Sequence, residues 1–220
     1  MPLHISDKGS GPTVIFLHGL DSDSSVWDPS VELLAQDHRC VTVDLPGHGQ
    51  SPNPSNLDAY TRAAVLADLD ALMADFDRPI HLVGHSLGGY LGLAHVITRP
   101  GILHGLILVS TGPGFRDDQA RQGWNERVEA NIPKYGVSAE AATMAFHIDS
   151  MVIDRIAEVD VPVALVVGSD DRAFLGANDY LERKLPDVVR TTVEGARHYV
   201  MRSNPEAVVD AVRSITARTA

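Results

Sequence analysis

The stretch Ile80-His81-Leu82-Val83-Gly84-His85-Ser86-Leu87-Gly88-Gly89 joins a short apolar run to a Gly-x-Ser-x-Gly pattern. The apolar run predicts a buried strand, and the residues from Leu87 onward can form a helix. A serine at such a junction is typical of a nucleophile elbow, a sharp turn that holds the hydroxyl clear of the sheet. The strained serine backbone brings its flanking segments close together, and Gly84 and Gly88 remove the side chains that would collide there.

The same letters also fit an ordinary Ser/Gly turn between a strand and a helix. A catalytic Ser86 needs a base, an acid and a second donor for a developing oxyanion, so these have to come from elsewhere in the chain.

Strands and helices alternate on both sides of this stretch. Apolar runs that predict strands cover 13–17, 39–43, 105–109, 161–168 and 188–193, with a short edge strand expected over 3–6. Helices are expected over about 26–36, 58–76 and 178–185, and from Asn204 to the end. Such alternation predicts an α/β fold with a mostly parallel sheet covered on both faces. The site of such a sheet lies at the carboxyl ends of its strands, where Ser86 is placed.

The alternation lapses between 112 and 158, where short helices are expected instead of strands. We interpret this segment as a small helical cap inserted between core strands of a single domain, 1–220. Trp124, Val128 and Ile132 share one apolar stripe, and Met144, Ile148 and Met151 share another. The stripes fit packing onto the body, or a roof over an acyl pocket for which Trp124 and Met144 are the candidates. A cap this short predicts an open site.

Composition excludes several kinds of partner. The net charge of −11 opposes binding to nucleic acid or to an anionic membrane. No apolar stretch is long enough to span a bilayer, and no signal peptide is visible, so a cytoplasmic protein is expected. The single cysteine, Cys40, excludes an internal disulfide and reads as a small buried strand residue. No phosphate-binding loop, dinucleotide fingerprint or zinc-ligand spacing is present, so neither cofactor nor metal is expected.

Five motifs together resemble the α/β-hydrolase superfamily: Leu17-His18-Gly19-Leu20, Asp44-Leu45-Pro46-Gly47-His48-Gly49-Gln50-Ser51, Gly84 to Gly89, Gly168-Ser169-Asp170-Asp171 and Gly195-Ala196-Arg197-His198. They follow the family's order of nucleophile, acid and histidine and cover nearly the whole chain. The chain looks most like the small carboxylesterase and enol-lactonase-like branch. One departure from the family concerns the first strand of the usual edge hairpin, for which we expect no counterpart in this sequence.

The resemblance implies a catalytic triad of Ser86 as nucleophile, His198 as general base and Asp171 as acid. Asp170 is the alternative acid, although the family's acid stands three residues after the glycine that ends its strand. The acid holds the imidazole in one tautomer and stabilises the imidazolium that forms during the reaction. The implied oxyanion hole uses the backbone N–H groups of Leu87 and Leu20.

Two further histidines have implied places beside the triad. His85 precedes the nucleophile and is expected to line the floor of the substrate pocket. His18 resembles the family's loop-bracing histidine and is interpreted as structural.

These residues predict a cofactor-free serine hydrolase that cleaves a carboxylic ester or lactone through an acyl-enzyme on Ser86. The expected partner is a small-molecule ester or lactone. A C–C hydrolase, lyase or perhydrolase could use the same triad, and a ligand-binding protein with a vestigial site could retain it. Acyl and alcohol specificity stay open, as does the choice between a monomer and a dimer.

Overall fold

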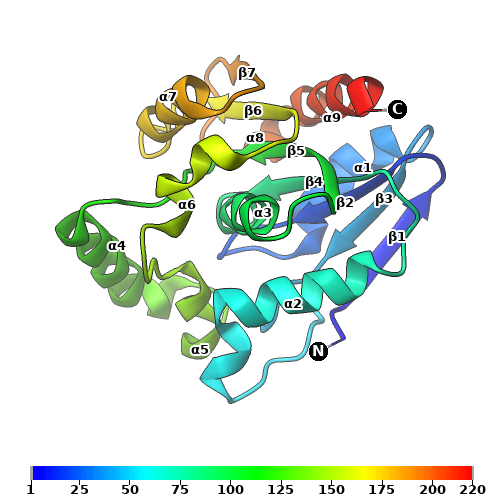
Figure 1. The fold of residues 1–220 in the computed structure, drawn as a ribbon. Helices are drawn as coiled ribbons and strands as arrows, with labels where there is room; N and C mark the ends of the chain where they lie inside the picture. The colour runs from blue at the N-terminus through cyan, green and yellow to red at the C-terminus, as the bar shows by residue number, and fades with distance from the viewer. Residues whose placement is uncertain (1, 220) are drawn as a thin grey trace.

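The computed structural model describes residues 2–219 and contains a seven-stranded sheet in the order β1-β3-β2-β4-β5-β6-β7 (Figure 1). Strand β1 pairs antiparallel with β3, and the other pairings in the described residues are parallel. The strands are β1 Ile5–Gly9, β2 Thr13–Leu17, β3 Arg39–Val43, β4 Ile80–His85, β5 Leu103–Val109, β6 Val163–Gly168 and β7 Val188–Val193. The mostly parallel α/β architecture predicted from the alternation is confirmed.

Helices connect the strands in the expected alternation. The α-helices are α1 Asp28–Leu34, α2 Arg62–Met73, α3 Leu87–Thr98, α4 Asp118–Asn131, α5 Ala139–Ala142, α6 Met151–Asp154, α7 Leu175–Lys184, α8 Val200–Ser203 and α9 Pro205–Thr219. Within residues 2–219 the 3₁₀ turns are η1 Ser24–Trp27, η2 Leu57–Tyr60, η3 Ile132–Lys134, η4 Thr143–Ala145 and η5 Ile156–Glu158.

The sheet separates two hydrophobic cores because successive strand side chains point to opposite faces. In β2, Ile15 and Leu17 pack into the core that holds apolar residues of α2, α3 and α7. Val14 and Phe16 pack into the other core, with residues of α1, α8 and α9. All five side chains of β2 are buried, as a strand covered on both faces requires.

Several predicted boundaries differ from the structure. The helix expected over 26–36 is divided into η1 and α1, and strands β5 and β6 begin at Leu103 and Val163 instead of at 105 and 161. The helix expected over 58–76 is divided, because Thr61 is extended and its side chain caps the N–H of Ala64, so that α2 begins after it. Helix α7 begins at Leu175, three residues before its predicted start. Strand β1 spans Ile5–Gly9 and not the predicted 3–6, because Gly9 still pairs with Arg39 across the sheet edge.

Between β5 and β6 the chain forms α4, α5 and α6, the segment predicted to be a cap. Figure 1 shows α4 at the far left, outside the layers that cover the sheet. The predicted apolar stripe of Met144, Ile148 and Met151 is wrong, since these residues lie on η4, a connecting loop and α6. Ile148 is 70% exposed, because the chain there is too broken to keep a helical periodicity.

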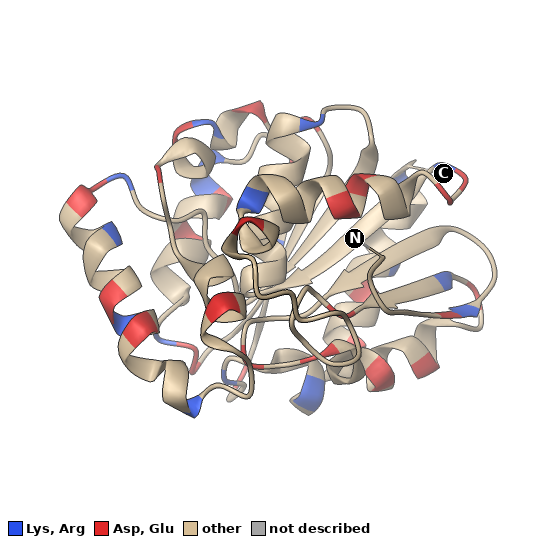
Figure 2. Ribbon diagram, turned by 90° about the horizontal axis from the view of Figure 1, so that it is seen from below, with Lys and Arg blue, Asp and Glu red and all other residues tan. Residues whose placement is uncertain are grey.

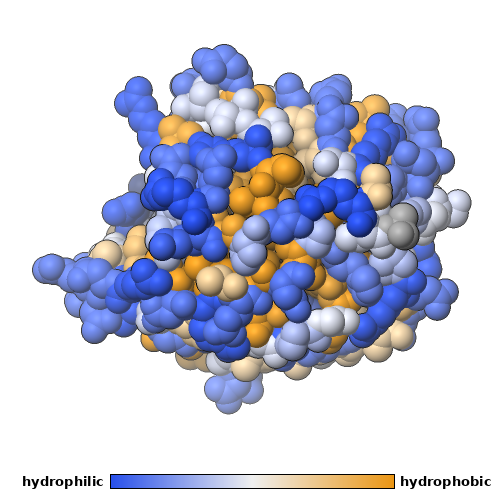
Figure 3. Space-filling model, turned by 45° about the horizontal axis from the view of Figure 1, so that its top comes forward, coloured by the Kyte–Doolittle hydropathy of each residue, from blue (hydrophilic) through white to orange (hydrophobic). Residues whose placement is uncertain are grey.

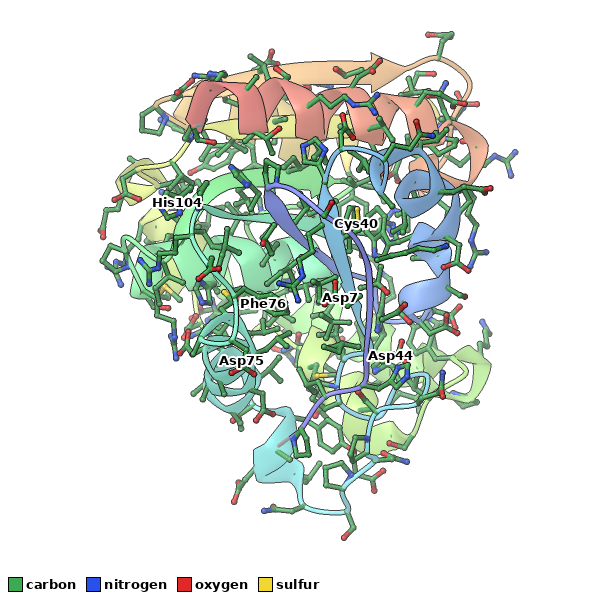
Figure 4. All side chains as sticks on the ribbon, turned by 90° about the vertical axis from the view of Figure 1, so that its right-hand side faces the viewer. Asp7, Cys40, Asp44, Asp75, Phe76 and His104 are labelled. Carbon is green, nitrogen blue, oxygen red and sulfur yellow. The ribbon has the colours of Figure 1, made fainter. Side chains whose placement is uncertain are left out.

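The surface carries mixed charges and scattered apolar side chains, as in an ordinary globular protein. Along the ribbon in Figure 2 acidic and basic positions are interspersed. On the face shown in Figure 3 hydrophilic side chains divide the apolar surface into patches. Cys40, labelled on β3 in Figure 4, is fully buried, as expected. Burial raises the pKa of its thiol to about 12. Among the described residues no helix combines the length and apolar character that crossing a bilayer demands.

Candidate active site

Ser86 occupies a strained turn between β4 and α3. Its φ of 50° and ψ of −112° lie outside the regions that L-residues favour. The backbone is held on both sides, since Ser86 N donates to Val109 O at 3.0 Å and Ser86 O accepts from Thr111 Oγ1 at 2.6 Å. A Cβ on Gly84 would lie 2.5 Å from Gly88 O, which is why glycine is required there. The turn therefore has the geometry of a nucleophile elbow.

Two backbone N–H groups flank the elbow as candidates for an oxyanion hole. Leu87 is the first residue of α3, so its N–H has no carbonyl partner within the helix. In the described residues Leu20 N donates to no backbone carbonyl. The loop that carries Leu20 lies against the elbow, because a Cβ on Gly19 would be 3.2 Å from Ser86 Cβ.

Histidines brace this loop, as expected for His18. The His18 Nδ1–H donates to Gly19 O at 2.7 Å, and its Nε2 accepts from Leu45 N at 3.0 Å. Burial, assisted by His48, lowers the pKa of His18 to about 4, so the ring is neutral and holds one tautomer at pH 7. The ring of His48 lies within hydrogen-bond distance of Leu20 O, at 2.7 Å.

Asp44 anchors the neighbouring loop after β3, where Figure 4 labels it. Its carboxylate accepts from Ser24 N at 2.7 Å and from Gln50 N at 2.9 Å. Burial alone would raise the pKa of Asp44, but these hydrogen bonds outweigh it and the pKa is lowered. The loop is therefore fixed by a buried carboxylate that stays charged at neutral pH.

An acid and a histidine meet beside the elbow. His198 Nδ1 lies 3.0 Å from Asp171 Oδ2, and the Asp171 side chain is 5% exposed. Asp170 is exposed, and its backbone N–H donates to Ala196 O, which ties together the loops that follow β6 and β7. Of the two candidate acids, the structure brings Asp171 to His198.

The imidazole of His198 is held between two rings. Phe174 stacks on it with ring centroids 4.8 Å apart, and the His85 ring lies 4.6 Å away. With Nδ1 on Asp171, the nitrogen left for a reacting serine is Nε2. Among the described residues no hydrogen bond joins His198 to Ser86, although both side chains line one pocket. Such contacts are often long without substrate and shorten in the reactive complex.

His85 stabilises the loop that carries His198. It is fully buried, and its Nε2 lies 3.0 Å from His198 O, so it donates to that carbonyl. Burial lowers the pKa of His85 well below its usual value, with a smaller effect of His198, which keeps the ring neutral. His85 does contribute to the pocket wall, where it was expected, but its polar contact is with the protein backbone.

The pocket over Ser86 has a volume of about 390 Å³. Residues of the elbow, the Gly19–Leu20 loop, the cap and the His198 loop line it together. Trp124 lies in its wall as expected, and its Nε1 donates to Ala145 O at 2.9 Å. Met144 does not lie in that wall, because its side chain is buried in the core that also holds α2 and α3.

Several residues of the pocket wall were not predicted: Tyr90, Phe115, Arg127, His147 and Phe174. Phe174 could have been proposed, because it follows the candidate acid by three residues. The others lie on α3 or the cap, and no motif marks them in the sequence. Among the described residues, no group of three or more His, Cys, Asp or Glu side chains is arranged to hold a metal ion.

The sequence profile of the "Alpha/beta hydrolase family" matches residues 14–211 of the chain. The chain belongs to this family. A curated relative, "2-(acetamidomethylene)succinate hydrolase" of Mesorhizobium japonicum, is 26% identical over 96% of this chain and 90% of that protein. The "Pimeloyl-[acyl-carrier protein] methyl ester esterase" of Aeromonas hydrophila is 33% identical, over 56% of this chain and 46% of that protein.

Solved structures show the same fold at low sequence identity. A structure from a study of carboxylesterases of the thaumarchaeon Nitrososphaera gargenis superposes with a TM-score of 0.84 at 19% identity, covering 99% of this chain and 94% of that one. MenH from S. aureus superposes with a TM-score of 0.83 at 18% identity, covering 98% of each chain. These likenesses extend to the cap segment and support the α/β-hydrolase architecture as a whole.

Proposed function

We propose that this α/β-hydrolase is a serine esterase or lactonase that works through an acyl-enzyme on Ser86. The main support is the 3.0 Å contact between His198 Nδ1 and a buried Asp171, beside a pocket that also contains the elbow serine. An imidazole held in this tautomer has its other nitrogen free to accept the Ser86 proton. That proton transfer is what makes a serine hydroxyl a competent nucleophile.

In the proposed reaction Ser86 Oγ attacks the ester carbonyl while His198 takes the serine proton. The oxyanion that forms accepts hydrogen bonds from the N–H groups of Leu87 and Leu20. His198 then gives its proton to the leaving alcohol, and the acyl group stays on Ser86. Water, deprotonated by His198, attacks the acyl carbonyl. The second oxyanion collapses with cleavage of the bond to Ser86 Oγ, the carboxylic acid leaves, and His198 returns the proton to Ser86.

A fluorophosphonate probe and a short p-nitrophenyl ester test the proposal. The probe should label the native protein once, at Ser86, and Ser86→Ala should abolish labelling. Ester turnover should fall by on the order of 10⁴-fold or more in Ser86→Ala and His198→Ala. Failure of a folded native sample either to react with the probe or to turn over esters would reject the proposal.

A second candidate is hydrolysis of a bond other than an ester by the same residues. It is favoured by the relative that matches this chain over 96% of its length, since the name 2-(acetamidomethylene)succinate contains no ester. Labelling of Ser86 without turnover of any ester or lactone would select this candidate. Hydrolysis of 2-(acetamidomethylene)succinate itself, measured as the release of acetate, would then test this candidate directly.

A further inference from the structure

The polar side chains of the pocket wall are mostly occupied by other protein groups. Tyr90 Oη accepts from Arg62 Nη1 at 3.0 Å, and Tyr199 Oη donates to Asp21 O at 3.1 Å. The Asn131 side chain is engaged at both atoms, since Nδ2 donates to Arg127 O and Oδ1 accepts from Lys134 Nζ. Groups that remain unpaired in this wall are therefore informative about what enters the pocket.

Arg127 is a charged residue of the pocket wall whose side chain is not paired with another described protein group. It is the single Arg or Lys among the residues that line the pocket, and no acidic side chain of residues 2–219 forms an ion pair with it. On the same helix Arg121 pairs with Asp118. In a chain with 29 acidic and 18 basic residues, a guanidinium without an acidic partner at a pocket wall is available for an anionic ligand.

The face of α4 that carries Arg127 is directed at the pocket. Trp124, Arg127, Val128 and Asn131 line it, a spacing of i, i+3, i+4 and i+7 along one side of the helix. The helix is fixed to the segment beneath it, because Asn125 accepts from His147 N at 2.9 Å and donates to His147 O at 3.0 Å. The helix that carries Arg127 is therefore held in place, and the Arg127 side chain itself is exposed where it lines the pocket.

His147 adds a second unpaired donor to the same wall. Its ring is packed edge-on against Tyr90 at 4.6 Å and Phe115 at 5.3 Å, which fixes its direction. Nδ1 is buried without a partner, whereas Nε2, which also has no partner within residues 2–219, keeps accessible surface on a residue that lines the pocket. Burial lowers the pKa of His147 to about 4, so the ring is neutral, and we assign its one N–H to Nε2.

We infer that the acyl group of the substrate carries a carboxylate remote from the scissile ester, and that Arg127 binds this carboxylate. The inference rests on the proposed esterase function. A planar guanidinium can donate two parallel hydrogen bonds to a carboxylate, and His147 Nε2–H offers a further donor to an acyl oxygen. The substrate class is thus a half-ester of a dicarboxylic acid or a lactone with a carboxylate side chain.

Asp21 is the one carboxylate of the pocket wall, and its negative charge opposes the binding of an anionic substrate. Its Oδ1 accepts from Gly136 N at 3.2 Å, and it lies beyond ion-pair distance of Arg127. A bound anion would be attracted by Arg127 and repelled by Asp21. Replacing each of the two residues should therefore change the preference for an anionic substrate in opposite directions.

The test compares monomethyl adipate with methyl hexanoate, which differ in the remote carboxylate and share the chain length. Hydrolysis is followed by proton release, and the quantity compared is the ratio of kcat/KM for the two esters. In Arg127→Gln the ratio should fall roughly tenfold, the loss of one charge-assisted pair. In Asp21→Asn it should rise. Arg183→Gln, the same change on the exposed surface of α7 away from the pocket, should leave it unaltered.

An equal loss on both esters in Arg127→Gln would overturn the inference, because it would assign Arg127 to the integrity of the cap. A native preference for methyl hexanoate would overturn it as well. Binding of monomethyl adipate to Ser86→Ala, measured by calorimetry with and without Arg127→Gln, tests the carboxylate site without turnover. If the native protein hydrolyses neither ester, the proposed function fails, and the calorimetry still decides whether Arg127 binds the anion.

Discussion

At the scale of single residues, the choice of the acid depends on burial and direction. Asp170 and Asp171 are adjacent and chemically identical, yet Asp171 is buried against His198 and Asp170 is turned to solvent. Both residues lie in the turn after β6, where Asp170 N donates to Ala196 O and Asp171 N donates to Gly168 O, and the turn directs only the Asp171 side chain at His198. The difference between the two carboxylates is therefore geometric.

The two aspartates provide a matched pair of variants. Asp171→Asn should lower kcat for a p-nitrophenyl ester by about 10⁴-fold, because the amide leaves the imidazole in the wrong tautomer. Asp170→Asn makes the same chemical change on an exposed side chain and should alter kcat less than about tenfold. Comparable losses in the two variants, with unchanged thermal stability, would transfer the role of acid to Asp170 or divide it.

At the scale of elements, glycines decide how closely α3 approaches the sheet. A Cβ on Gly88 would lie 2.5 Å from Leu17 O and 2.7 Å from His18 O, so the helix start touches the backbone of the loop after β2. Gly123, in the middle of α4, has no atom within 4 Å of the corresponding position. The first glycine is required by packing, whereas the second only adds conformational freedom to the unfolded chain.

Alanine should therefore have opposite effects at these two glycines. Gly123→Ala should raise the free energy of unfolding by about 0.5–1 kcal/mol, since alanine favours a helix interior over glycine. Gly88→Ala should lower it by more than about 2 kcal/mol, because fixed backbone atoms cannot move away from the new methyl group. Urea unfolding of both variants measures this, and a neutral Gly88→Ala would show that α3 can shift away from the loop.

At the scale of the whole molecule, neutral histidines are built into distant parts of the structure. Burial lowers the pKa of His18, His81 and His147 to about 4 in each case, with smaller effects of nearby charges. They lie in the loop after β2, in strand β4 and in the cap. In the unfolded chain the same rings protonate near pH 6.5.

The protein should therefore lose stability as the pH falls from about 6.5 toward 4. In this window the unfolded chain binds protons that the folded protein does not bind. The free energy of unfolding therefore rises with pH, and stability is lost on acidification. Each buried histidine contributes up to about 3 kcal/mol over the window. Urea unfolding at pH 7.5, 6 and 5 measures how steeply the free energy of unfolding changes with pH. In His81→Gln this slope should correspond to about one proton fewer taken up on unfolding. A flat profile would contradict the neutral buried rings.

The sequence by itself determined the alternating architecture and the place of the reacting serine. Apolar runs, helix signals and the glycines of the elbow act over a few neighbouring residues. Their pattern can therefore be recognised in the sequence. The resemblance in five short motifs located Ser86 and His198, because these residues occupy loops whose positions follow from the strand order. The segment between β5 and β6 was recognisable in the sequence only as an interruption of the alternation. Its first apolar stripe placed Trp124 and Val128 at the pocket, whereas the second stripe was wrong.

The resemblance predicted Asp171 as the acid, and the structure brings it to His198. Only the tertiary structure decided that Met144 is core and that Arg127 and His147 line the pocket. Each of these outcomes depends on how segments far apart in the chain pack against one another. Local propensity does not encode the direction in which a cap side chain points once its helix has docked. Burial and partner choice are properties of the assembled molecule, and the chemistry of the pocket wall depends on both.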